Sequence, residues 1–209
     1  MNSHEEMMVN YLQERGISLE YAKAAGLRAV DANTARSMGF PYARRSQGGI
    51  IFPYFNPLDD KRHSTLLRVR YLGKLPCDDT GKEIRYTQPS CSGVEAFFDT
   101  NVDWLKVMQN HRITIAITEG EAKALYMNQH RKALGGIVTI ALGGVWNFLE
   151  KGTEDLTPWL RMVRAASRAR RREIIIAFDS DMAENQSIQA AALRLSYLLE
   201  IDVRGGVCA

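Results

Sequence analysis

Apolar and polar positions alternate along the chain in two different ways, and the change falls near residue 108. After it, apolar runs that predict strands buried on both faces are separated by stretches with the period and caps of helices. The expected strands are 112–120, 137–144, 173–181 and 202–209, and the expected helices are 121–133, 157–170 and 187–200. This order predicts an α/β domain in which helices flank a parallel sheet, with right-handed crossovers.

The first half of the chain predicts a smaller α+β subdomain. SHEEMMVNYLQERG and SLEYAKAAG have the caps and apolar spacing of two short helices. GGIIFPYFNP and TLLRVRYLG predict two strands joined by the polar turn NPLDDKRH, and therefore an antiparallel unit. We expect the two domains to be residues 1–108 and 109–209. Because the chain stops inside an expected strand, we also expect it to be a fragment of a longer protein.

Two carboxylates, Asp179 and Asp181, follow the apolar run IIIAF. They lie at the carboxyl end of an expected strand, and in open α/β sheets this edge is where ligands bind. Residues i and i+2 of an extended segment point the same way, so both carboxylates can reach one cation such as Mg²⁺ or Mn²⁺. The alternative is that FDSD caps the next helix or begins a turn.

Glu119 ends a second expected strand and is followed by Gly120, which permits close approach to the backbone. The parallel order brings Glu119 to the same edge as Asp179 and Asp181. Three carboxylates would repel one another there unless a cation or a shared proton lay among them, so the pattern favours a metal site. The alternative is an ordinary acid at a helix N-terminus, a part that Glu121 could play equally well.

The basic residues are clustered in a few segments, whereas their excess over the acidic residues is small. The net charge of +3 does not by itself identify a nucleic-acid-binding protein. Six arginines lie between residues 161 and 172 with no acid among them, and Arg161, Arg164 and Arg168 share one helical face. Such a face can contact phosphates, or it can simply be solvated.

The composition also argues against disulfide-rich, zinc-finger, membrane-spanning and secreted proteins. A hydrophobic content of 45% is sufficient for a core. The three cysteines form no CxxC pair, which argues against a zinc finger or a disulfide framework. The sequence has no apolar run of membrane-spanning length, and its N-terminus is too acidic and polar for a signal peptide. We therefore expect a cytoplasmic protein without a membrane partner.

The segments IAITEGEAKALYM, ALGG and IIIAFDSDM, in this order, resemble a Toprim domain, the metal-binding catalytic fold of bacterial DnaG-type primases, topoisomerases and some nucleases. Upstream, the expected hairpin followed by RYTQPS and AFFD is similar in order to the basic subdomain that precedes Toprim in DnaG-type primases. TEGEAKAL looks closest to the Toprim-like domains of phage, plasmid and mobile-element replication proteins. The resemblance covers nearly the whole chain, although Lys123 stands where primases usually carry an acid.

This resemblance implies a primase-like nucleotidyltransferase that synthesises primers on single-stranded DNA from nucleoside triphosphates. Asp179 and Asp181 would hold Mg²⁺ or Mn²⁺, with Glu119 as a further ligand or as general base. The residues implied to hold template or nucleotide are Arg68, Arg70, Arg85, Tyr86 and Lys123. A replicative helicase, or a further domain of the same protein, is an implied partner. A Toprim-type metal-dependent nuclease and a non-catalytic module that binds DNA or a helicase remain as alternatives.

Overall fold

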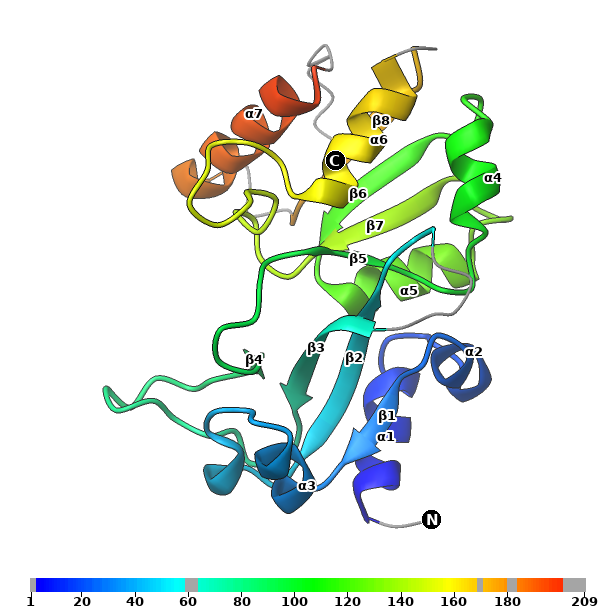
Figure 1. Ribbon diagram of the computed structural model, residues 1–209. Coiled ribbons are helices and arrows are strands. Elements are labelled where there is room, and N and C mark those ends of the chain that lie inside the picture. The colour runs from blue at the N-terminus through cyan, green and yellow to red at the C-terminus, as the bar shows by residue number, and fades with distance from the viewer. Residues whose placement is uncertain (1–2, 59–63, 169–170, 180–183, 201–209) are drawn as a thin grey trace. The chain divides into compact units, whose positions relative to one another are not determined.

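The computed structural model describes residues 3–58, 64–168, 171–179 and 184–200. The chain divides into two compact units (Figure 1). The first comprises Met1–Gly93 and Asp99–Asn101, and the second comprises Val94–Phe98 and Val102–Ala209. In the part of the chain that the structure describes, no helix is both long and apolar enough to span a bilayer.

The first unit is built on an antiparallel sheet of order β1-β2-β3-β4. Its strands are β1 (Arg28–Val30), β2 (Gly49–Phe55), β3 (Ser64–Tyr71) and β4 (Tyr86–Thr87). Its helices are α1 (Ser3–Gln13), α2 (Leu19–Ala24), α3 (Ala32–Ser37) and the 3₁₀ turn η1 (Ala43–Arg45). The two helices and the hairpin predicted from the sequence all form, because their caps and alternating apolar positions agree with the packing around them.

Different elements cover the two faces of this sheet. On one face, Val69 and Tyr71 of β3 pack in a core with residues of α3 and η1. Successive side chains of a strand alternate between faces, so Arg68 and Arg70 point to the opposite face. Helix α1 covers that second face mainly over β1 and β2. Over β3 and β4, this second face carries Arg68, Arg70 and Tyr86.

Asp99 anchors residues 99–101 in the first unit. Its carboxylate is fully buried and accepts hydrogen bonds from the Tyr21 hydroxyl at 2.6 Å and from the backbone N–H of Asn101 at 2.9 Å. The Asn101 side-chain amide also donates to the Tyr21 carbonyl at 3.0 Å. These bonds satisfy a buried charge, which is why this short segment is held firmly against α2.

The second unit is an α/β layer structure around a sheet of order β5-β7-β6-β8. Its strands are β5 (Ala96–Phe98), β6 (Ile115–Glu119), β7 (Val138–Leu142) and β8 (Ile174–Ala177). Its helices are α4 (Trp104–Gln109), α5 (Glu121–Gln129), α6 (Pro158–Arg168) and α7 (Gln186–Leu199). Strands β7, β6 and β8 run parallel, and β5 pairs antiparallel with β7. The predicted α/β class is confirmed, with a mixed sheet in place of a wholly parallel one.

Helices cover both faces of this sheet, with α5 on one side and α4 and α6 on the other (Figure 1). The larger core joins Ile117 and Ile140 of the sheet to Leu160 of α6 and Leu195 of α7. On the α5 side, the Asn128 amide donates to the Thr139 carbonyl at 2.9 Å and accepts from the Thr139 N–H at 2.7 Å.

Three details differ from the sequence-based expectations. The boundary falls before β5, not near residue 108, because β5 pairs with β7 and α4 packs in the core of the second unit. Strand β8 was expected to be buried on both faces, but among the described strands it lies at an edge of the sheet, opposite β5, and Ile175 is exposed. The fourth strand expected at 202–209 lies outside the described residues.

Candidate active site

The carboxyl ends of three parallel strands meet at one edge of the second unit's sheet. Glu119, the last residue of β6, is paired in register with Leu142, the last residue of β7. Thr118 is paired with Ala177, the last residue of β8, and Asp179 follows two residues later. Glu119 and Asp179 therefore leave the sheet at the same edge. Asp181 lies outside the described residues.

The backbone at Gly120 is open to approach from outside. Gly120 has φ of +90°, a conformation that side-chain-bearing residues rarely adopt, and it is the N-cap of α5. A Cβ atom built there would meet no heavy atom of the described residues within 4 Å. The turn between β6 and α5 thus needs glycine for its conformation and not for lack of room, and it lies at a helix N-terminus, where N–H donors favour anionic groups.

Lys123 lies against Asp179. Its ammonium forms an ion pair with Asp179 Oδ1, and the two side chains are 47% and 46% exposed. Lys123 is on the first turn of α5, and Asp179 follows β8, so the β6–α5 turn places the cation beside the carboxylate. One of the expected carboxylates is therefore neutralised within the chain. The argument that repulsion alone demands a metal ion is correspondingly weaker.

Glu119 and Glu121 are not equivalent, although the sequence alone gave either one the role of a helix acid. Glu119 is half-buried at the end of its strand. Glu121, the first residue of α5, is only 1% exposed. The difference arises because the chain turns at Gly120, which directs residue 121 toward the protein interior. Glu121 is thus part of the packing, and Glu119 is the accessible acid.

The donor chemistry at this edge fits a hard divalent cation such as Mg²⁺ or Mn²⁺, which prefers carboxylate oxygens. The described residues contribute Glu119 and Asp179, and Lys123 competes for the second of them. Over residues 3–58, 64–168, 171–179 and 184–200, no group of three or more His, Cys, Asp and Glu side chains could hold a metal ion. A complete carboxylate set would therefore need Asp181.

The arginines of α6 are engaged within the second unit. We refer to Arg161, Arg164 and Arg168 as the α6 arginines. Their guanidinium groups pair with Glu150 at 2.6 Å, Asp155 at 3.2 Å and Glu200 at 3.1 Å, respectively. These contacts neutralise the face that the sequence offered as a possible nucleic-acid surface.

Arg172 has a structural position. It is 5% exposed, and its guanidinium donates to the carbonyls of Val107 at 2.6 Å and Met108 at 3.1 Å, in the last turn of α4. A cation is favourable at the C-terminus of a helix, where carbonyls lack intrahelical donors. Burial lowers the pKa of the Arg172 guanidinium, because the charged form loses its hydration.

In the first unit, arginine and tyrosine side chains alternate on the face left open beside α1. Arg68 and Arg70 of β3 lie over the ring of Tyr86 on β4, at 4.7 Å and 4.8 Å from its centroid. Arg15 and Arg70 lie over the ring of Tyr11, at 3.8 Å and 5.7 Å. We call these five residues the arginine–tyrosine ladder. Such contacts between a guanidinium and an aromatic face are attractive without neutralising the charge.

The ladder includes residues that sequence reasoning missed and excludes one that it named. Tyr11 and Arg15 were not expected; Arg15 lies in the turn that follows α1, where its guanidinium donates to the Tyr11 carbonyl. The structure brings Arg68, Arg70 and Tyr86 together because β4 pairs with β3. Arg85 is exposed, and its side chain makes none of these contacts.

Comparison with known proteins adds evidence on the fold. Residues 103–204 match the model of a family described as a domain of unknown function, DUF3854. No curated protein matches the sequence. Among solved structures, the chain is similar to the DnaG catalytic core, with 16% sequence identity and a TM-score of 0.55.

The alignment with the DnaG catalytic core covers 94% of this chain and 61% of the other, so this chain spans less than two thirds of that protein's length. At this level of identity the likeness concerns the fold. The chain thus has a DnaG-like α/β fold.

Proposed function

We propose that this protein is a primase-like, metal-dependent nucleotidyltransferase of the Toprim type, which synthesises primers on single-stranded DNA. The observation that supports this most is the meeting of Glu119 and Asp179 at the carboxyl edge of the sheet, beside the open backbone at Gly120. The likeness in fold to the DnaG catalytic core supports the same function. Cytoplasmic location and a role in the replication of a phage, plasmid or other mobile element are further parts of the proposal.

The acids would divide the work of phosphoryl transfer. Asp179, with Asp181, would hold Mg²⁺ or Mn²⁺, which when bound neutralises charge on nucleotide phosphates. Glu119 would accept the proton of the attacking 3′-hydroxyl or serve as a further ligand. Lys123 would release Asp179 and contact the nucleotide phosphates that arrive there. The ion pair seen in the structure would then belong to the resting protein.

The first unit would supply the surface for template or nucleotide. Arg68 and Arg70 present guanidinium groups, Tyr86 presents a ring, and Arg85 is an exposed residue that directly precedes Tyr86 in the sequence. Guanidinium groups bind phosphates in a salt-dependent way, and aromatic rings stack on bases without regard to sequence. A replicative helicase, or a further domain of the same protein, would separate the strands of the template.

A second candidate is a non-catalytic replication module that binds DNA. The ion pair between Lys123 and Asp179 favours it, because it gives Asp179 a cation from within the chain. Under this proposal the fold is retained for contacts with DNA or a helicase, and the carboxyl edge performs no chemistry.

The test is incubation with single-stranded templates and labelled nucleoside triphosphates in the presence of Mg²⁺ or Mn²⁺. New oligonucleotides support a primase, shortened templates indicate a Toprim-type nuclease, and neither product indicates the non-catalytic module. Asp179→Asn combined with Asp181→Asn should abolish the metal-dependent product and leave the protein folded, since removing like charges from one edge does not destabilise it. Unfolding of this double variant would make the pair structural.

Glu119→Gln provides the sharper variant, and Glu173→Gln is its control. Glu173 lies at the opposite, amino end of β8, where it accepts a hydrogen bond from the Thr114 hydroxyl at 2.8 Å. Glu119→Gln should remove the product with little change in melting temperature, because the half-buried acid is not part of the core. Glu173→Gln should leave product formation intact. Equal activity of the two variants would refute the role proposed for Glu119.

A further inference from the structure

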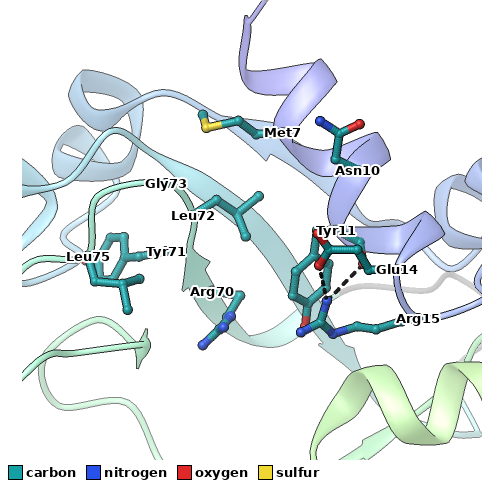
Figure 2. A pocket seen from close by; sticks show the side chains of 10 residues that line it. All are labelled: Met7, Asn10, Tyr11, Glu14, Arg15, Arg70, Tyr71, Leu72, Gly73 and Leu75. Atoms are coloured by element: carbon teal, nitrogen blue, oxygen red, sulfur yellow. Dashed lines mark hydrogen bonds and ion pairs between the residues drawn. The ribbon is translucent and has the colours of Figure 1, made fainter.

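A cavity of about 300 Å³ lies in the first unit, between α1 and the end of β3 (Figure 2). Its wall includes Tyr11 from α1, Arg15 from the turn that follows α1, and Arg70 from β3. Figure 2 shows Arg15 and Arg70 beside the ring of Tyr11, with the apolar side chains of Met7 and Leu72 lining another part of the wall. The volume is at the lower end of the range for small-molecule sites, which is about 300–1,000 Å³.

The cavity wall is positively charged. Arg15 and Arg70 contribute two guanidinium groups, and Glu14 contributes one carboxylate. Glu14 lies 3.3 Å from Arg15 in an exposed pair, which contributes little because both groups are hydrated. No carboxylate forms an ion pair with Arg70 within the part of the chain that the structure describes. One full positive charge is therefore left over in the wall of this open pocket.

Arg70 also has an unused donor. Its Nε atom is buried and has no hydrogen-bond partner among the described residues. Its guanidinium is held between the rings of Tyr11 and Tyr86, which fixes its position without using its N–H groups. A buried donor that lacks an acceptor is unfavourable, and more so when it is charged. Because the Arg70 side chain also lines the pocket, the remaining N–H groups of its guanidinium are positioned to meet an anionic acceptor there.

Arg15 completes the geometry. It donates to the Tyr11 carbonyl at 3.1 Å and lies 3.8 Å from the centre of the Tyr11 ring. Two guanidinium groups on one ring, both in the cavity wall, match a tetrahedral oxyanion that can accept from several directions. A carboxylate ligand would meet the same donors but would offer fewer oxygens to them.

We propose that this cavity binds a phosphate group through Arg15 and Arg70, carried either by a free nucleotide or by a nucleic-acid strand. The proposal deepens the proposed function and rests on it in part, because Arg70 also belongs to the template or nucleotide surface. It adds Tyr11 of α1 and Arg15 of the turn after α1 to that surface. The ladder would then include a pocket for a single phosphate in addition to its exposed side chains.

The experiment measures binding of two probes by the full chain at low salt in the presence of EDTA, by isothermal titration calorimetry. The probes are ATP and a short oligothymidylate without a terminal phosphate. Arg15→Gln removes one guanidinium from the cavity. The matched control is Arg44→Gln, which removes an exposed arginine from η1, on the other face of the sheet. Thermal melting of both variants verifies that each remains folded.

We expect Arg15→Gln to weaken binding of at least one probe about tenfold or more, as for the loss of a charge-assisted hydrogen bond. Arg44→Gln should leave both affinities nearly unchanged. An effect on ATP identifies the phosphate of a free nucleotide, and an effect on the oligothymidylate alone identifies that of a strand. If both variants weakened binding equally, the probes would be attracted by general surface charge and not bound in the pocket, which would overturn the proposal. Failure of the wild-type protein to bind either probe would also overturn it.

These outcomes are separate from those of the primer-synthesis test. If no variant or condition yields a product while Arg15-dependent binding persists, only the proposed activity fails. If the protein synthesises primers and Arg15→Gln binds both probes as the wild type does, only the phosphate cavity fails.

Discussion

Two sets of arginines in this chain have the same chemistry and opposite surroundings. The α6 arginines pair with carboxylates of their own unit, and Arg172 is buried against carbonyls of α4. Arg70 on β3 instead lies over the rings of Tyr11 and Tyr86, neutral partners that leave its charge intact. The α6 arginines and Arg172 thus have partners within their own unit, whereas Arg70 retains its charge for a ligand. The surroundings of an arginine, more than the number of arginines, indicate a nucleic-acid surface.

The largest expected effect is on folding. Arg172→Ala should lower the free energy of unfolding by about 3 kcal/mol or more, because it removes a buried charged donor and leaves carbonyls at the end of α4 without a partner. Urea denaturation followed by circular dichroism measures this loss. If the variant had the same denaturation midpoint as the wild type, Arg172 would contribute no more to the stability of the fold than an exposed arginine does.

The next largest effect is on the affinity for single-stranded DNA, which should depend on the β3 arginines and not on the α6 arginines. Arg70→Ala should weaken binding of single-stranded DNA about tenfold at low salt and reduce the slope of log affinity against log salt by about 0.7, the value for one phosphate contact on a single strand. The matched control is Arg164→Ala, whose guanidinium is already paired with Asp155. Salt titrations by fluorescence anisotropy give both quantities. The opposite ranking would move the binding surface to α6.

A substitution of Lys123 tests whether a metal ion and the Lys123 ammonium compete for Asp179. Lys123→Gln should lower the Mg²⁺ or Mn²⁺ concentration needed for half-maximal thermal stabilisation by roughly threefold to fivefold, because Asp179 loses a competing partner of modest strength. Lys132→Gln, on the segment after α5, is a control for the loss of one positive charge. Identical metal titrations for the wild type and both variants would indicate that the carboxyl edge does not bind these ions.

The smallest effect belongs to the most exposed pair of the α6 set. Arg168→Ala should change the free energy of unfolding by less than about 0.5 kcal/mol, since the Arg168 side chain is 73% exposed and its pair with Glu200 is solvated. Single-stranded DNA affinity should also remain close to that of the wild type. A large change in affinity would reveal Arg168 as a phosphate contact and would blur the distinction between the two sets.

The sequence predicts elements well where caps and periodic apolar positions agree. The helix expected at 187–200 is observed as Gln186–Leu199, with Ala191, Leu195 and Leu199 buried along one stripe. By contrast, β5 is three residues long, too short for a period to emerge, and its antiparallel pairing with β7 depends on a partner far along the chain. Local pattern thus predicts elements, whereas their neighbours in the sheet depend on tertiary packing.

The candidate site shows the same division. Strand ends predict that Glu119 and Asp179 reach one edge, because parallel strands share a direction. The pairing of Lys123 with Asp179 could not be predicted, since it depends on how α5 turns at Gly120. The arginine–tyrosine ladder could not be predicted from local sequence either, because it joins distant segments. The hydroxyl oxygens of Tyr11 and Tyr86 lie 3.3 Å apart, although 75 positions separate the two residues.

The amide of Asn128 has a consequence for self-association. Thr139 of β7 lies one residue beyond Ile140, the last β7 residue that pairs with β5. Without another partner, its backbone N–H and C=O groups would be unpaired on that side of the strand. Asn128 takes both the N–H and the C=O of that residue, as a neighbouring strand would. An incoming extended peptide finds no donor or acceptor there to begin a ladder, which protects this side of the strand from the strand-to-strand growth that leads to aggregates.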